Sequence, residues 1–503
     1  MRTVHDRLIR ATVGTITAGI FTPPLAAALS AVAPTLLAVA IGLALGVIAG
    51  RMVASRVSYA FLDLLESRRV FAAWTIVGLF VVTQSVRLSV FMHDVSRVSY
   101  SVFPSGKLFG ILNPGFVHHA CLTAYLEGAA IAEQPGINIY DLKYYAEVGC
   151  DLTRIAECAG RKIGPIEIDP FQYPPQFLLL PAAARVFTTD FFALRPVWFG
   201  IQVALLGLAV FLTARWIGGH TGRRAMLFAP ALGICFPVLI GLQVGNVQVS
   251  IYSCSMLAML LFAARRDITG GALLGFLVTG KIFPGVLALY LLSKRRLAAV
   301  TWTAAFASLL TVLTVFVFGV RPLRDFLSYQ MPRLSNGDAF PWVDLPNLLP
   351  VNYGFYALVR NLQSLGVNVA THNVSITAAS VYGVVVLVLA FAAGVRLARV
   401  RNDDERARSR EAQVWLALVI LASLRGPFVP DAYAMVGALW LLTLVAADAQ
   451  RLSWQRGAAL ILAGIMLSTV LENNIPLQTV VPIVVFSMCR DVLVLSLAIW
   501  TIV

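Results

Sequence analysis

Several ionisable side chains that could carry group-transfer chemistry lie within one polar stretch of an otherwise apolar chain, residues 93–175. His118 and His119 are candidate general bases, because the imidazole pKa lies near neutrality. Asp94 and Asp141 are candidate carboxylate bases in the same stretch. Helix capping by Asp94 and loop ordering by the histidine pair are simpler roles, and the sequence leaves both readings open.

A lysine between two apolar runs is the sharpest candidate for binding an anion. Lys281 lies between the apolar residues 270–279 and 282–292. An ammonium group facing an outer cavity is suited to holding a phosphate as a point charge, with Arg321 and Arg324 as second choices. The alternative is that the Lys281 stem lies along apolar surface and places its charge in the outer interface.

Amide and aromatic side chains supply groups of the kind that bind sugars. Gln243, Asn246 and Gln248 lie in one turn between apolar runs, where polar groups at membrane depth are costly. Helix capping and interhelical hydrogen bonding are their simpler role. The other candidates for binding sugar or acceptor are Tyr140, Asp169, Tyr173 and Trp342.

The six cysteines form no zinc-binding pattern, because there is no Cys-x-x-Cys and no Cys/His set with ligand spacing. Adjacent histidines rarely bind one ion, so we expect no metal and no other cofactor. A disulfide between Cys150 and Cys158 stays open if both lie outside the cytoplasm. Nothing resembles a phosphate-binding loop or a serine nucleophile elbow.

The elements that must position these groups are membrane helices. Hydrophobic residues make up 59% of the 503 residues and charged residues 13%, against roughly 45–50% and about 25% in soluble domains. Uncharged runs such as 297–320 and 374–395 are long enough to cross a bilayer. The net charge of +14 comes from short basic clusters between apolar runs. That pattern is typical of cytoplasmic loops and argues against a nucleic-acid-binding face.

With every basic cluster in the cytoplasm, the chain is predicted to be an all-α polytopic membrane protein of about 14 transmembrane helices, within a range of roughly 12–14. The polar stretch then becomes a large first external loop, ending in an interfacial helix over 173–187. An initial hairpin turns near 23–34, and 225–241 cross as one span. Residues 268–293 are too few for two full spans, so two short helices are expected to meet near Lys281.

Five motifs, in this order, resemble glycosyltransferase family 87, which includes phosphatidylinositol-mannoside mannosyltransferases. They are Asn138–Asp141, Tyr173–Pro175, Gly241–Gln248, Gly280–Pro284 and Leu291–Arg296, within a resemblance that runs from about Val70 to Val320. The resemblance implies a GT-C fold, a polyprenyl-phosphate-sugar donor, an outer-face active site and inversion at the anomeric carbon. Family members usually carry an acidic base early in the first external loop. Residues 116–121 hold no carboxylate, so the base stays open among His118, His119, Asp94 and Asp141.

The predicted activity is transfer of a sugar, of mannose or arabinose type, from a polyprenyl-phosphate donor to a lipid or glycan acceptor. The expected location is a bacterial cytoplasmic membrane, with the site facing outside and with membrane lipids, not nucleic acid, as further partners. The alternatives are a secondary transporter or lipid-linked-sugar flippase, which broken helices would suit, and a non-catalytic scaffold. The predicted units are a hairpin with a cytoplasmic segment (1–69), a GT-C catalytic module of about seven helices (70–320), a second external loop (321–373) and C-terminal membrane helices (374–503).

Overall fold

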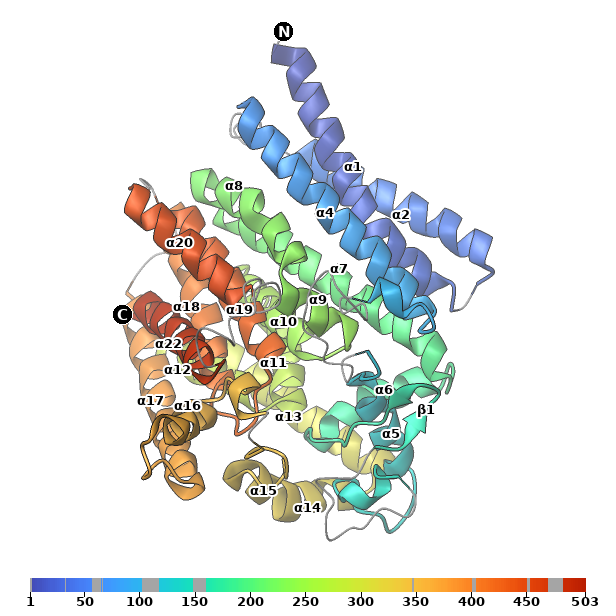
Figure 1. Cartoon of the computed structure of the whole chain (residues 1–503), viewed down its shortest axis with the longest axis vertical. Coiled ribbons are helices and arrows are strands. Elements are labelled where there is room, and N and C mark those ends of the chain that lie inside the picture. Colours follow the sequence, from blue (N-terminus) through green and yellow to red (C-terminus); the bar gives the residue numbers. More distant parts are fainter. Residues whose placement is uncertain are drawn as a thin grey trace.

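The computed structural model describes residues 2–31, 33–56, 65, 67–101, 117–147, 160–345, 348–399, 404–449, 453–468 and 483–503. These ranges are almost entirely helical (Figure 1). The expected all-α polytopic membrane architecture is confirmed by seven described helices long and apolar enough to cross a bilayer. They are α1 (Arg2–Leu29), α2 (Thr35–Arg56), α4 (Arg68–His93), α7 (Phe191–Ile217), α13 (Leu297–Phe318), α17 (His372–Leu397) and α22 (Ile483–Ile502).

An eighth span in the described residues would be a broken one. Helix α8 (Gly219–Phe228) continues into the 3-10 helix η6 (Ala229–Ile234), and α9 (Phe236–Gln243) follows with a bend of 60°. The prediction that 225–241 cross as one span did not include this bend, which arises because Cys235 is extended and Pro237 restarts the helix at its first turn. A single crossing through this bent pair stays a prediction. The shorter apolar helices are α5 (Leu122–Ala132), α10 (Gln248–Ala263), α11 (Asp267–Gly280), α12 (Val286–Ser293), α19 (Asp431–Asp448) and α20 (Trp454–Leu467). The total number of crossings stays a prediction.

The N-terminal hairpin packs through small residues. Gly42, Gly46 and Gly50 recur every four residues along α2, and a Cβ atom at Gly42 would lie 2.8 Å from the backbone nitrogen of Ala26 on α1. Such spacing lets two membrane helices approach closely. The hairpin turns after α1 ends at Leu29, and α1 runs through Pro23-Pro24 without ending there. In Figure 1, α1, α2 and α4 lie along one side of the molecule.

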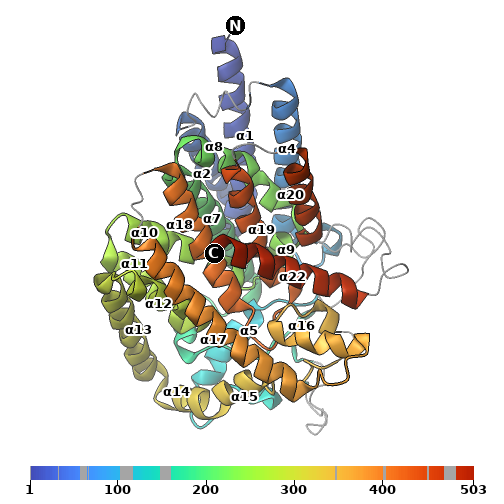
Figure 2. The same cartoon turned by 90° about the vertical axis from the view of Figure 1, so that its left-hand side faces the viewer.

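Helix α18 (Glu405–Ser423) lies at the centre of the C-terminal half and is buried from Glu411 to Leu421. It packs against α10, α17 and α19 (Figure 2). Two polar contacts fasten it to the rest of the core. The Trp415 indole donates to the carbonyl of Ser255 at 2.9 Å, and Lys294 Nζ lies 2.6 Å from the Glu411 carboxylate.

The break expected within 268–293 is confirmed. Helix α11 ends at Gly280, Lys281 is extended (φ −146°, ψ 131°), and the 3-10 helix η7 (Phe283–Gly285) leads into α12. Gly271 and Gly275 face α13, where added Cβ atoms would meet the backbone of Thr303 at 2.9 Å. This close packing holds the end of α11, and therefore Lys281, in place.

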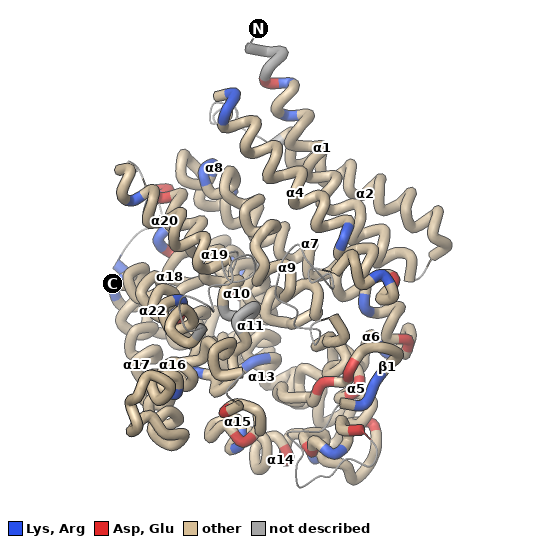
Figure 3. The backbone as a smooth tube through the Cα atoms, viewed as in Figure 1, with Lys and Arg blue, Asp and Glu red and all other residues tan. Residues whose placement is uncertain are grey.

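Short elements cluster at one end of the molecule, where Asp and Glu are also concentrated, while Lys and Arg mark the far ends of α4 and α8 (Figure 3). Residues 321–373, expected as a loop, contain several short helices. The short elements are η1 (Val98–Tyr100), η3 (Leu142–Tyr144), β1 (Lys162–Ile163), β2 (Ile166–Glu167), η5 (Pro175–Leu178), α6 (Leu179–Arg185), α14 (Arg321–Asp325), the π-helix η8 (Phe326–Gln330), α15 (Met331–Asn336), η9 (Leu349–Val351), α16 (Phe355–Asn361) and η10 (Leu362–Leu365).

Candidate active site

A small β-hairpin brings two distant parts of the polar stretch together. Strands β1 and β2 pair through Lys162 with Glu167 and Ile163 with Ile166, around a turn at Gly164, whose φ of +58° favours glycine. Glu167 then forms a parallel bridge with His119, and its amide donates to the carbonyl of His118 at 2.8 Å. The hairpin therefore places the residues after β2 beside the residues before α5.

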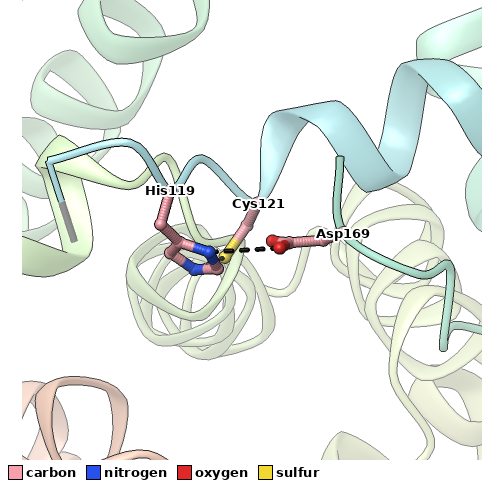
Figure 4. A group of neighbouring side chains, drawn as sticks. All are labelled: His119, Cys121 and Asp169. Atoms are coloured by element: carbon pink, nitrogen blue, oxygen red, sulfur yellow. Dashed lines mark hydrogen bonds and ion pairs between the residues drawn. The ribbon is translucent and has the colours of Figure 1, made fainter. Parts of the chain in front are cut away.

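This pairing sets Asp169 against His119. The Thr123 hydroxyl accepts a hydrogen bond from the Asp169 amide at 3.0 Å, and His119 Nδ1 lies 3.1 Å from Asp169 Oδ1, with the side chains 28% and 24% exposed (Figure 4). Burial alone would lower the pKa of His119. The charge of Asp169, together with the contacts that Asp169 and Cys121 make with the ring, outweighs burial and holds the pKa of His119 well above its ordinary value.

Cys121 joins this pair to the amide turn between α9 and α10. Its Sγ lies 3.5 Å from His119 Nε2 and accepts a hydrogen bond from Asn246 Nδ2 at 3.2 Å. Gly245 makes the turn with φ +67°, and a Cβ atom there would be only 3.1 Å from Trp198. The turn is further held by the Gln202 amide, which donates to the Asn246 carbonyl at 2.7 Å.

Lys281 reaches the same turn from the broken helix. Its Nζ donates to Gln248 Oε1 at 3.0 Å and lies 5.2 Å from the centre of the Tyr173 ring. Asn246 Oδ1 accepts from the Gln248 amide at 2.9 Å, so the two amide side chains are linked through the backbone of the turn. A continuous polar chain thus runs from Asp169 to Lys281.

Aromatic rings form one wall beside this chain. Tyr173 stacks on Phe177 with ring centres 5.2 Å apart, and its hydroxyl lies 3.2 Å from that of Tyr125. Tyr140 is buried, and its hydroxyl donates to the Tyr173 carbonyl at 3.0 Å. Burial raises the pKa of Tyr173, so its hydroxyl stays protonated at neutral pH. Tyr173 offers the site a ring face, whereas Tyr140 supports Tyr173 from behind.

His119, Cys121 and Asp169 place three ligand-type atoms within 4.8 Å of one another. A set of imidazole, thiolate and carboxylate is one that Zn²⁺ accepts. However, Asp169 contacts Nδ1 of His119 while Cys121 faces Nε2. A single ion would bind only one of those nitrogens. The geometry fits a hydrogen-bonded relay through the imidazole better than a chelate.

The other candidate bases make contacts of a different kind. His118 is exposed and takes part through its backbone carbonyl. Asp94 accepts hydrogen bonds from Ser96, which lower its pKa and make it a weaker base. Asp141 caps η3 and lies 2.9 Å from Lys143 Nζ. None of these contacts joins them to the chain from Asp169 to Lys281.

The remaining predicted site residues also have contacts of their own. Arg321 pairs with Asp325 at 3.4 Å, and Arg324 is exposed on α14. Trp342 packs edge-on against Phe428 with ring centres 6.3 Å apart. Gln243 is buried at the end of α9. Their roles in binding donor or acceptor stay predictions. Cys150 and Cys158, weighed as a disulfide, lie outside the described residues.

Two residues of the site, Cys121 and Tyr125, were not predicted from the sequence. Cysteines were weighed for disulfides and zinc patterns, and Cys121 fits neither. The available signal was its position, because Cys121 lies two residues after His119 and directly before α5. Tyr125, one turn further along α5, was also missed. Its hydroxyl accepts a hydrogen bond from the Val247 amide at 3.0 Å.

Comparison with curated proteins and with solved structures gives no match. A family model described as Glycosyltransferase family 87 matches residues 171–427, about half of the chain. The match includes Tyr173, the amide turn and Lys281, and it continues beyond the limit of Val320 expected from the motifs. It begins after His119 and Asp169, so the match leaves out the part of the chain that holds this pair. The chain belongs to glycosyltransferase family 87 and is a membrane glycosyltransferase.

Proposed function

We propose that the protein transfers a sugar, of mannose or arabinose type, from a polyprenyl-phosphate donor to a lipid or glycan acceptor on the outer face of the membrane. One observation carries the proposal: the His119–Asp169 pair and the Lys281 ammonium lie at opposite ends of a continuous chain of polar contacts through Cys121, Asn246 and Gln248. A base and a cation separated by amide groups are what transfer from a phosphate-linked sugar requires.

The acceptor hydroxyl loses its proton to the pair. His119 accepts the proton on its ring, and Asp169 stabilises the resulting imidazolium from the Nδ1 side. The acceptor oxygen then forms a bond to the anomeric carbon as the bond from that carbon to the phosphate oxygen breaks. Attack on the face opposite the leaving phosphate inverts the configuration. Asp169, expected among the sugar-binding groups, here supplies the carboxylate that residues 116–121 lack.

The bonding electrons leave with the polyprenyl phosphate, whose negative charge increases as the bond breaks. Lys281 is the cation nearest the amide turn, and a preorganised charge aimed at a developing anion is a large contribution to catalysis. The Gln248 oxygen that holds Lys281 in the present geometry would be exchanged for phosphate oxygens. Gln248 and Asn246 are then left to hydrogen-bond sugar hydroxyls, and the Tyr173 ring offers an apolar face for the sugar.

Two features support placing the reaction outside the cytoplasm. Helix α5 and strand β1, near which His119 and Asp169 lie in the chain, are at the end of the molecule where acidic groups gather, opposite the basic ends of α4 and α8 (Figure 3), and basic clusters favour the cytoplasmic face. The reaction as written needs no metal and no soluble cofactor, because the base and the leaving-group cation are both side chains.

Purified protein in detergent, incubated with polyprenyl-phosphate-linked labelled mannose or arabinose and a glycolipid extract, tests the proposal. We expect a labelled glycolipid and an equal amount of released polyprenyl phosphate. Transport has no meaning without a sealed membrane, so product formation excludes a pure flippase. The proposal fails if neither sugar is transferred by protein that remains folded, or if Asp169→Asn transfers at the rate of the unchanged chain.

A further inference from the structure

A large apolar cavity lies away from the polar site, between the N-terminal hairpin and the rest of the molecule. Its volume is about 580 Å³, and its walls come from α1, α4, α7, α8, η6 and α9, the helices that lie along the upper part of Figure 1. Cavities of roughly 300–1,000 Å³ bind ligands of moderate size. Such an apolar volume between membrane helices is suited to hydrocarbon chains.

One end of the cavity is polar and positively charged. Arg215, Arg223 and the Trp74 indole all contribute to the lining. Met226, less than one turn from Arg223, packs against the cluster that contains Trp74, so these groups share one end. Within the described part of the chain, buried Nε of Arg223 and Nε1 of Trp74 have no hydrogen-bond partner. Two buried donors without acceptors are costly and indicate a missing acceptor.

This charged end is far from the proposed active site. Helix α7 contacts the amide turn through Gln202 and reaches the cavity's basic end at Arg215. These two positions are separated by roughly 20 Å along the axis, at a rise of about 1.5 Å per residue. The hydrocarbon layer is about 30 Å thick. An anion at Arg215 therefore lies nearer the membrane face opposite the one that faces Lys281.

We propose that this cavity binds one anionic glycerophospholipid from the leaflet opposite the active site. Its acyl chains fill the apolar volume between α4 and α7, and its phosphate accepts hydrogen bonds from Arg223 and Trp74, with Arg215 as a second cation. An apolar volume with a guanidinium end matches a lipid with a phosphate head, whereas a neutral hydrocarbon would leave both donors without acceptors. The lipid holds the N-terminal hairpin against α7 and is not a substrate.

The donor lipid does not fit this assignment. Its phosphate must reach Lys281 for transfer, and one phosphate cannot contact both Lys281 and Arg223 across the bilayer. The cavity approaches the amide turn at Leu242, beside buried Gln243, and at Val203, beside Gln202. The inference therefore does not depend on which sugar or acceptor the enzyme uses, and binding is measurable without turnover.

Native mass spectrometry of delipidated protein, titrated with phosphatidylglycerol or with phosphatidylcholine of the same acyl chains, tests the proposal. We expect one phosphatidylglycerol to bind at least roughly tenfold more tightly, because the choline ammonium of the second lipid would be repelled by Arg215 and Arg223, whereas the phosphates of the two lipids offer the same acceptors. The double variant Arg215→Gln/Arg223→Gln should lose this preference. Val210→Trp, which fills the tail volume, should weaken both lipids. Arg456→Gln, an exposed arginine on α20, is the matched control and should bind as the unchanged chain does.

Equal affinity of the unchanged chain for the two lipids would overturn the proposal, and this comparison needs no variant to fold. Retention of the preference in the double arginine variant would also overturn it. Displacement of phosphatidylglycerol by polyprenyl phosphate would assign the cavity to the donor and would overturn the proposal of a separate lipid. Lys281→Met, which alters the proposed donor site, should leave phosphatidylglycerol binding unchanged.

Discussion

The described part of the chain contains two histidine–aspartate pairs, and they differ in what surrounds them. His119 Nδ1 lies 3.1 Å from Asp169, and His372 Nδ1 lies 2.8 Å from Asp344. The exposed fraction of the side chains hardly distinguishes the two pairs, because all four side chains are about a quarter to a third exposed. In the second pair, Asp344 also accepts hydrogen bonds from Tyr356 at 2.6 Å and from Arg360 at 2.9 Å.

In the second pair, the carboxylate and both ring nitrogens have strong hydrogen-bond partners, and we call it the saturated pair. His372 Nε2 lies 3.1 Å from the carbonyl of Asn336, so both ring nitrogens face oxygen atoms. In the first pair, Nε2 faces the Cys121 sulfur, a weak partner that a substrate hydroxyl can replace at low cost. The comparison teaches that a histidine–aspartate pair is a poor sign of catalysis by itself. The partner of the second ring nitrogen distinguishes a histidine that can act as a base from one that only stabilises the structure.

Substitutions in the two pairs should therefore have opposite effects, and this is the largest difference expected. His119→Gln and Asp169→Asn should lower the transfer rate by about 10²–10⁴-fold, the usual contribution of a positioned base, in protein that remains folded. Asp344→Asn should keep most of the activity. Transfer rates and melting temperatures are measured on the same detergent-purified samples. Comparable activity losses in Asp344→Asn and Asp169→Asn would erase the distinction.

Each pair is connected to a cation, the first to Lys281 through the polar chain and the second directly to Arg360. Lys281→Met should reduce transfer by about 10²–10³-fold, as expected when one charge that stabilises a developing anion is removed. Arg360→Gln should affect stability more than rate, because Arg360 is already bonded to Asp344. Lys143→Met is the matched control, since Lys143 is exposed and pairs with Asp141. Full transfer activity in folded Lys281→Met would remove the leaving-group role.

The pH dependence of the transfer rate should reflect the ionisation of the His119–Asp169 pair alone. The pKa of His119 is raised, so its imidazole is protonated below that pKa and can act as a base only above it. The transfer rate should rise with pH through this raised pKa. Removing the carboxylate in Asp169→Asn should move the rising limb to lower pH, because the charge that favours the imidazolium is lost. Single-turnover rates of both proteins across the pH range measure the shift. A rate that falls as pH rises would instead make the Asp169 carboxylate the base, beside a protonated His119.

The sequence predicted the groups of the site better than their pairing. Assigning every basic cluster to the cytoplasm placed Lys281, the amide turn and the polar stretch on one side of the membrane. The break at Lys281 followed because residues 268–293 are too few for two spans. The contact of Asp169 with His119 depends on a hairpin whose strands are two residues each, too short for any periodic pattern. The bend at Cys235 was not predicted, because the apolar residues on both sides of it resemble one continuous span. Trp342 stays a predicted sugar platform. Its packing against Phe428 could not be predicted, because the two residues are 86 positions apart in the sequence.

The smallest expected effect is on the stability of the saturated pair. Burial raises the pKa of Asp344, but hydrogen bonds from Tyr356, His372 and Arg360 outweigh it and lower that pKa below its ordinary value. The carboxylate therefore stabilises the fold above the ordinary pKa of an aspartate, and this contribution is lost as the pH falls through the lowered pKa. Asp344→Asn should cost roughly 1–2 kcal/mol near neutral pH, modest because the pair is partly solvated.

Melting temperatures of Asp344→Asn and of the unchanged chain should therefore converge on acidification. Asp169→Asn should show the opposite dependence. The raised pKa of His119 stabilises the fold below that pKa, so the difference in melting temperature between Asp169→Asn and the unchanged chain should close as the pH rises through it. A gap between the Asp344 variant and the unchanged chain that stays constant into acid would mean that the carboxylate charge is irrelevant there. The saturated pair would then act through shape and neutral hydrogen bonds. The contrast with His119 and Asp169 would rest on the partner of the second ring nitrogen, and the charge of the carboxylate would have no part in it.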